Sequence, residues 1–394
     1  MGKIIEVKAG KLSYALLLVF LLFGIGGNVI GGEPIARIIS TRIICSQPDK
    51  YIGWATIVKT KKGELIVVFS GDRDAHVCPW GKTQMVKSTN NGNTWSDPIT
   101  INNTPLDDRD AGIIQTSKGT LLVSWFTSLA FDNFSEVAWQ KLPQLMLDGW
   151  KRHIEKIGPD TRKQWLGNWI RRSVDGGDTW GKYIDSIVTA PHGPVELTDG
   201  RLLYVGINHK KGDKSIPQPL AEKLIAAAES RDDGQTWKII GYIPVPNDLG
   251  TKASDFVEPH LVETTDGKLV AMLRHRGTFL WQTESHDGGK TWTVVHQTNI
   301  VGRPPHLIHL KNNWLLVSYG RRREPYSERA CISRDSGKTW DVDNEITLTS
   351  APNGDLGYPT SVQLDDGSIL TIYYQVAKSG EKTCLMGTHW RLEP

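Results

Sequence analysis

The sequence has few of the residues that mark metalloproteins and disulfide-rich domains. It contains four cysteines in 394 residues, and their spacing matches no zinc motif. It shows no nucleotide-binding motif, so we expect no cofactor, although Asp-rich loops could take Ca²⁺ as a structural ion. The formal net charge is only +3. This balance gives no reason to expect nucleic acid as a partner.

The sequence also lacks an apolar run that is long enough to span a membrane. The run Tyr14–Ile25 is shorter than the ~20 residues that a spanning helix needs. It follows Lys3, Lys8 and Lys11 and precedes small residues that continue to Gly32, which is typical of a secretory signal. We therefore expect a signal peptide over 1–32 and an exported chain, secreted or periplasmic, without a membrane span after cleavage.

One short phrase, Ser-x-Asp/Asn-x-Gly-x-Thr-Trp, occurs five times. Its Asp or Asn can bond to its own backbone and its Gly tolerates positive φ, as tight turns require. The Thr and Trp that follow favour strands. Each copy is therefore predicted to be a β-hairpin turn that its Trp anchors to a repeating unit. The copies begin at Ser88, Ser173, Ser230, Ser285 and Ser333.

A second repeated element consists of two apolar strands joined by a tight polar turn. Continuous apolar runs such as 65–69 and 121–125 indicate strands that are buried on both faces. Six such inner hairpins combine with five outer turns, which predicts an all-β, six-bladed β-propeller over residues 33–394. The polar turns lie at Lys62-Gly63, Lys118-Gly119, Asp199-Gly200, Asp266-Gly267, Asn312-Asn313 and Asp366-Gly367.

The missing sixth outer turn indicates how the ring closes. The last blade runs out of sequence after its third strand, so we expect Ala36–Cys45 to supply the fourth. That pairing would bring Cys45 beside Cys384 and makes a disulfide between them plausible. Cys78 and Cys331 have no obvious partner.

Two segments interrupt the repeat. Apolar residues from Phe131 to about Asn168 follow a helical period, which predicts a helical insertion (131–168) between the second and third strands of blade two. A shorter insertion, 209–222, occupies the same position in blade three. Because both insertions leave from one edge of the propeller, the longer one is a candidate lid or wall.

Strand direction separates the repeated turns from the expected pocket. First strands begin at the edge where second strands end, and both kinds of turn lie at the opposite edge. Convergent Arg, His and carboxylate side chains at this pocket edge suit an anionic sugar or another acidic ligand. The alternative is that these groups are polar surface residues that pair with one another. The candidates are Arg73, Asp74, His76, Arg109, Asp110, His192, Glu258, His260, Arg274, Arg303, His306, Arg321 and Tyr358.

The repeated phrase matches the Asp-box, and the mature chain resembles the sialidase (neuraminidase) superfamily of six-bladed propellers. The resemblance implies a Tyr nucleophile activated by a Glu, an arginine triad for the substrate carboxylate, and an Asp acid/base. Tyr358 corresponds to the nucleophile and Glu258 to its partner. Arg274 corresponds to the second triad arginine, and Arg321 or a neighbour to the third.

The first half departs from that pattern. No arginine is found near Ile52-Gly53-Trp54, where the family's first triad arginine is expected, and Lys82 lies where the acid/base Asp is expected. Asp110 or Asp74 could serve as the acid instead.

Three functions therefore stay open. The leading hypothesis is a glycosidase of the exo-α-sialidase type, which removes a terminal acidic or modified sugar from a glycan. The second is a polysaccharide lyase acting on uronates, with His192, His260 or His306 as the base. The third is a non-catalytic glycan-binding propeller.

Overall fold

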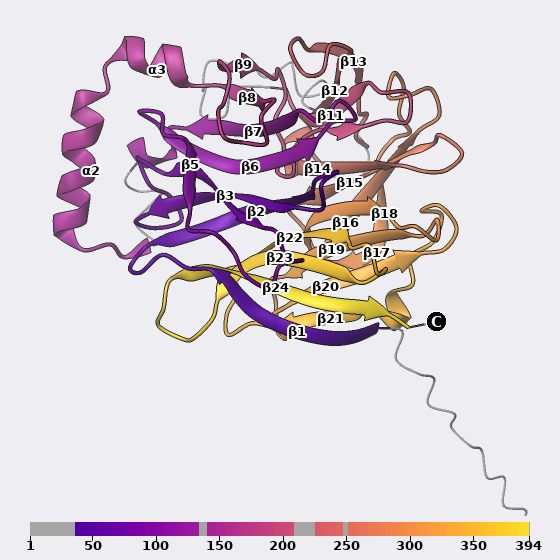
Figure 1. Ribbon diagram of the computed structural model, residues 1–394. Helices are drawn as coiled ribbons and strands as arrows, with labels where there is room; N and C mark the ends of the chain where they lie inside the picture. The colour runs from indigo at the N-terminus through magenta and orange to yellow at the C-terminus, as the bar shows by residue number, and fades with distance from the viewer. Residues whose placement is uncertain (1–35, 134–139, 209–224, 247–250, 394) are drawn as a thin grey trace, which may run out of the picture. The chain divides into compact units, whose positions relative to one another are not determined.

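A computed structural model describes residues 36–133, 140–208, 225–246 and 251–393. They form six four-stranded antiparallel sheets, which confirms the six-bladed β-propeller (Figure 1). Blade 1 comprises β2 (Tyr51–Lys59), β3 (Leu65–Arg73), β4 (Lys82–Ser88) and β5 (Ile99–Asn102). Blade 2 comprises β6 (Asp107–Gln115), β7 (Leu121–Ser128), β8 (Asn168–Ser173) and β9 (Ile184–Asp185). Blade 3 comprises β10 (Val195–Glu196), β11 (Leu202–Ile207), β12 (Ile225–Ser230) and β13 (Lys238–Tyr242).

The remaining blades follow the same order from the centre outward. Blade 4 comprises β14 (Phe256–Glu263), β15 (Leu269–His275), β16 (Phe279–Ser285) and β17 (His296–Val301). Blade 5 comprises β18 (Arg303–His309), β19 (Leu315–Arg321), β20 (Ser327–Ser333) and β21 (Ile346–Ser350). Blade 6 comprises β22 (Leu356–Gln363), β23 (Ile369–Val376), β24 (Thr383–Leu392) and β1 (Ala36–Cys45). Short 3-10 turns lie at Ala130–Asp132, Ala253–Asp255 and Val342–Asn344.

The second strand of each blade is buried on both faces, as the apolar runs predict. Every residue of β7, β11 and β23 is buried. Neighbouring blades share these side chains: Ile66 and Val68 of blade 1 pack with Leu121 and Val123 of blade 2. The core therefore lies between the blades as a series of such clusters.

The ring closes through β1, with the predicted bounds. This strand pairs antiparallel with β24, from Ala36 opposite Leu392 to Cys45 opposite Leu385, and the two strands lie side by side in Figure 1. The suggested disulfide is wrong, because both Cys45 and Cys384 are free thiols. A register shift between Ile43 and Cys45 sets Cys45 against Leu385 rather than Cys384.

The repeated phrase forms the predicted turn, which the copy at Ser285 illustrates. The Ser285 hydroxyl accepts from the Gly289 amide (2.9 Å) and donates to Asp287. Asp287 in turn accepts from the amide and the hydroxyl of Thr291, at 2.9 and 2.6 Å. Gly289 has a φ of 91°, which a side chain would oppose. The indole of Trp292 donates to the Gly289 carbonyl (3.0 Å) and fixes the turn to the blade.

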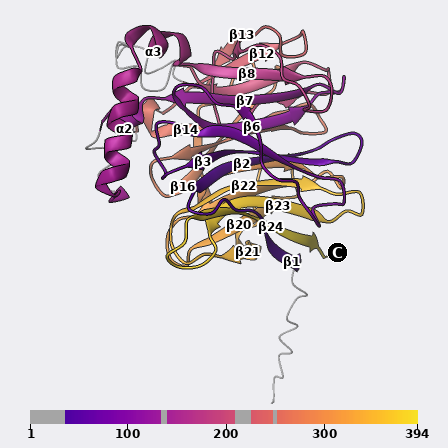
Figure 2. The same ribbon diagram turned by 60° about the vertical axis from the view of Figure 1, so that its left-hand side comes forward.

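The insertion in blade 2 is helical, as predicted, and lies between β7 and β8. It contains α2 (Gln144–Lys156) and α3 (Pro159–Trp165), which stand beside the ends of blades 1 and 2 in Figures 1 and 2. Trp150 of α2 is buried with Val77, Cys78 and Leu106. Residues 134–139 of this insertion, the insertion predicted in blade 3 and the expected signal peptide lie outside the described residues. None of the described helices is long and apolar enough to span a membrane.

Candidate active site

Four blades carry the same irregularity near the start of their first strand. In blades 1, 2, 4 and 6, two residues of the first strand oppose one residue of the second, which is a β-bulge. The bulge residues are not glycine, yet all have left-handed φ values between 51° and 55°. A bulge redirects a side chain, and such strain is typical of functional positions. The residues are Trp54, Asp110, Glu258 and Tyr358.

Two of these bulge residues meet across the centre of the propeller. The Tyr358 hydroxyl donates to Oε1 of Glu258 at 2.6 Å. Nη1 of Arg274 donates to both Glu258 oxygens, at 2.9 and 2.7 Å, and lies 3.5 Å from the Tyr358 hydroxyl. Burial, followed by the charges of Glu258 and Asp110, raises the pKa of Tyr358 well above its ordinary value. The phenol is therefore protonated in this arrangement.

The arginine that reaches Tyr358 from blade 5 is Arg322, the neighbour of the predicted Arg321. Its guanidinium lies over the Tyr358 ring, 5.6 Å from the centroid. It donates to the Leu356 carbonyl (2.8 Å) and to the Tyr374 hydroxyl (3.0 Å). Arg321 is the last residue of β19, where it pairs with Ser327. Sequence alone could not choose between adjacent arginines, because strand ends do not fix side-chain direction.

Arg303, at the start of β18, adds another cation to this end of the site. It is half-buried and donates to the Arg276 carbonyl at 3.3 Å. Burial lowers the pKa of Arg303, and repulsion from Arg274, Arg322 and Arg323 lowers it further. Such a group of like charges attracts an anion.

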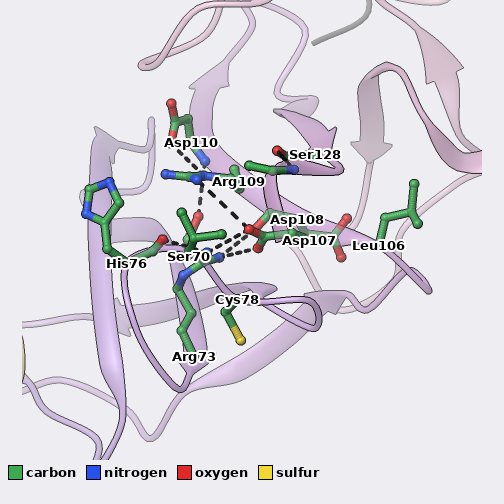
Figure 3. Close-up of polar contacts among 12 residues, drawn as sticks. Ser70, Arg73, His76, Cys78, Leu106, Asp107, Asp108, Arg109, Asp110 and Ser128 are labelled. Atoms are coloured by element: carbon green, nitrogen blue, oxygen red, sulfur yellow. Dashed lines mark hydrogen bonds and ion pairs between the residues drawn. The ribbon is translucent and has the colours of Figure 1, made fainter. Parts of the chain in front are cut away.

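The candidate residues of blades 1 and 2 are largely bound to one another (Figure 3). Arg73 donates to both oxygens of Asp107, at 2.6 and 2.8 Å, and to the His76 carbonyl at 2.9 Å. Arg109 lies 4.0 Å from carboxylate oxygens of both Asp107 and Asp110. The Arg73 guanidinium is thus occupied by hydrogen bonds within the protein, whereas Arg109 makes longer ionic contacts.

Trp54 lies where the family's first arginine is expected. Two guanidinium groups flank its buried ring, that of Arg73 at 4.9 Å and that of Arg109 at 4.6 Å. The His76 ring meets Trp54 edge-on at 4.8 Å, and the Tyr358 ring lies 6.4 Å away. Trp54 therefore makes cation–π contacts with both guanidinium groups on this side of the site.

Asp74 and Asp110 have different surroundings, although both were candidate acids. Asp74 accepts from the indole of Trp150 (2.9 Å) and from Lys50 (3.5 Å), so it anchors the helical insertion. Lys82, found in place of the family's acid, forms an ion pair with Asp72. Asp110 occupies a bulge position and acts electrostatically on Tyr358. Of the two carboxyl groups, Asp110 is therefore the better placed to act on a ligand beside Tyr358.

The three candidate histidines cluster together, and the His192 ring lies 6.3 Å from the Tyr358 ring. His260 and His306 stack at 4.5 Å, and His192 lies 5.6 and 4.8 Å from them. His260 accepts from the Leu307 amide, and His306 from the Ser361 amide. The pKa of each is lowered mainly by burial, that of His260 to about 3. These neutral rings pack as part of the core.

Among the described residues, no group of three or more His, Cys, Asp or Glu side chains could hold a metal ion.

The fold is that of a sialidase-like six-bladed propeller. Residues 150–372 match the BNR repeat-like domain family, and the chain belongs to this family. A search of curated proteins finds no match.

Solved structures share the architecture over most of the chain. A protein of unknown function from Dyadobacter fermentans is 25% identical, with a TM-score of 0.72 over 92% of this chain and 100% of that one. The Hadza microbial sialidase Hz136 is 17% identical, with a TM-score of 0.60 over 86% of this chain and 65% of that one. The intramolecular trans-sialidase of Ruminococcus gnavus is 14% identical, with a TM-score of 0.60 over 87% of this chain and 96% of that one. At these low identities the two sialidase structures show a shared fold.

Proposed function

We propose that this protein is an exo-acting glycosidase of the sialidase type that removes a terminal acidic sugar from a glycan. The observation that carries the proposal is the 2.6 Å hydrogen bond from Tyr358 to Glu258, with Arg274 bound to the same carboxylate. A phenol is a weak nucleophile until a base removes its proton, and Glu258 is placed to do so. Arg274 and Arg322 lie beside the phenol, where they can hold an acidic group of the substrate.

The reaction would take place in two steps. Tyr358 gives its proton to Glu258 and attacks the anomeric carbon, while Asp110 protonates the oxygen of the leaving group. Water then attacks the tyrosyl–sugar bond with Asp110 as the base, and the phenol recovers its proton from Glu258. The anomeric configuration is retained because two displacements occur at the same carbon. The short apolar run near the N-terminus supports an exported enzyme acting on extracellular or periplasmic glycans.

The test removes one atom, the hydroxyl oxygen of Tyr358. Tyr358→Phe removes the nucleophile and should lower turnover of chromogenic acidic glycosides, sialosides included, by at least about a hundredfold. Tyr373→Phe is the matched control, because Tyr373 is a buried blade 6 tyrosine that bonds to Thr388 (2.7 Å). Both variants should keep the circular dichroism spectrum of the wild type.

The alternatives give different outcomes in the same assay. Retained activity in Tyr358→Phe would refute the proposed nucleophile. Glycan binding by the wild type without turnover of any glycoside would identify a binding propeller. An unsaturated product that absorbs in the ultraviolet would identify a uronate lyase.

A further inference from the structure

A fully buried carboxyl group lies close to Gly357 of β22, the strand that carries Tyr358. Glu328 belongs to β20, pairs with Gly320 of β19, and has an exposed fraction of 0%. The amide of Gly357 lies close enough to influence this carboxyl. Within the described part of the chain, however, neither carboxyl oxygen makes a hydrogen bond of normal geometry. A buried carboxylate in that setting is costly, so the neutral acid is favoured.

Close backbone packing connects Glu328 with the candidate site. A Cβ atom built on Gly320, the partner of Glu328, would lie 2.9 Å from Cα of Gly357. A Cβ atom built on Gly357 would lie 3.1 Å from Nη2 of Arg322. Gly320, Gly357 and Arg322 are thus in direct contact, and Tyr358 follows Gly357 in the chain.

The charges around Glu328 differ between its two protonation states. Burial raises the pKa of Glu328 to about 8, and attraction to Arg322 lowers it only in part. The other titratable groups that influence it are Tyr373 and Tyr374 of β23. Arg322 donates to a carbonyl and a phenol, and neither group carries a formal charge. Glu258 and Asp355 also act electrostatically on Arg322. While it is protonated, Glu328 adds no further negative charge beside this guanidinium.

We propose that Glu328 is a positioning residue that, while protonated, leaves the charge of Arg322 to the acidic group of the substrate. The inference rests on the proposed function, since it takes the Tyr358 pocket to bind an acidic sugar. After proton loss, the buried carboxylate would compete with the substrate for the Arg322 guanidinium and would repel its acidic group. Anion binding and protonation of Glu328 are then reciprocally linked, so binding above neutral pH takes up a proton.

Calorimetric titration with two free sugar acids, N-acetylneuraminate and D-glucuronate, tests this linkage without turnover. The wild type should bind at least one of them at pH 6.5, and its affinity should fall about five-fold or more by pH 9. Glu328→Gln keeps the shape of the side chain but cannot ionise. Its affinity should therefore stay within about two-fold over the same range. Proton uptake, measured at pH 8.5 in two buffers, should disappear in this variant.

Glu345→Gln is the matched control within blade 5. Glu345 accepts from Tyr319 and Arg329 rather than from the candidate site, so the pH dependence of binding should persist in this variant. The proposal is overturned if Glu328→Gln keeps the alkaline loss, if wild-type affinity is flat from pH 6.5 to 9, or if neither sugar acid binds the wild type. Turnover is measured separately on chromogenic glycosides. Binding that weakens at alkaline pH, without turnover of any glycoside, would refute the proposed glycosidase activity and leave the role of Glu328 intact.

Discussion

The guanidinium of Arg73 and the carboxylate of Asp107 form a two-point ion pair in which neither side chain is exposed to solvent. The pair joins the end of β3 to the start of β6, so it couples blades 1 and 2 at the pocket edge. Such a pair makes a modest net contribution to stability, but either partner left alone is a buried, uncompensated charge.

Asp107→Ala should therefore lower the free energy of unfolding by about 3–5 kcal/mol. Chemical denaturation followed by tryptophan fluorescence measures this loss. The control is Asp365→Ala, since Asp365 pairs with Lys59 but its side chain is 80% exposed. Breaking that exposed pair should cost much less, because solvent screens its attraction. Equal losses in the two variants would contradict the structural role given to Arg73.

The histidine cluster should make the fold sensitive to acid. Burial lowers the pKa values of His192, His260 and His306 in the folded protein below the ~6.5 of an unfolded chain. The unfolded state then binds more protons, so stability is fully present above about pH 6.5 and is lost as the pH falls. Each ring could contribute up to roughly 2 kcal/mol of loss at pH 5.

Thermal unfolding between pH 7.5 and 5 measures this effect. His260→Gln removes one titrating ring and should flatten the fall in melting temperature. His286→Gln is the control, because His286 lies in the exposed part of an Asp-box turn. A melting temperature that is constant over this range would show that the three histidines are not held neutral.

The Asp-box carboxylates should affect stability and leave catalysis unchanged. Asp287→Ala removes the acceptor for the Thr291 amide and hydroxyl and should cost about 1 kcal/mol, as the loss of a helix cap does. Asp287→Asn should cost less, because Asn90 in the first copy accepts from the Thr94 amide and donates to the Thr94 hydroxyl. Denaturant titration measures both costs. A large change in turnover in either variant would place this turn closer to the chemistry than the structure does.

The sequence predicted the propeller because its determinants are local and repeated. Turn residues and apolar runs recur in every blade, so each copy supports the reading of the others. The closing strand was also predictable, since the last blade lacked one strand and only one unassigned segment remained. The disulfide was wrong because a single register shift at Cys45 decides which residue it faces. That shift leaves no signature in the sequence.

The site was predictable as an edge of the propeller rather than as a set of partners. Tyr358, Glu258 and Arg274 meet there, but the sequence could not show that Arg73 is paired with Asp107 or that Asp74 is held by Trp150. The sequence also gave no reason to select Glu328, which lies in the middle of a strand. Burial and pairing of charged groups depend on tertiary packing, which periodicity does not report. The four bulges could have been suspected only from bulky or charged residues near each strand start.

The pairing of β1 with β24 has a kinetic consequence. Thr41 and Thr388 share a hydrogen bond across 347 positions of the chain. Contacts of such long sequence separation form slowly, because loop-closure entropy must be lost before they stabilise the chain. During synthesis β1 emerges from the ribosome before the other strands of the propeller and β24 after them, so β1 stays an unpaired edge while the other blades form. Completion of the ring is therefore expected to be a late event, and a chaperone that shields β1 until then would prevent aggregation through this edge.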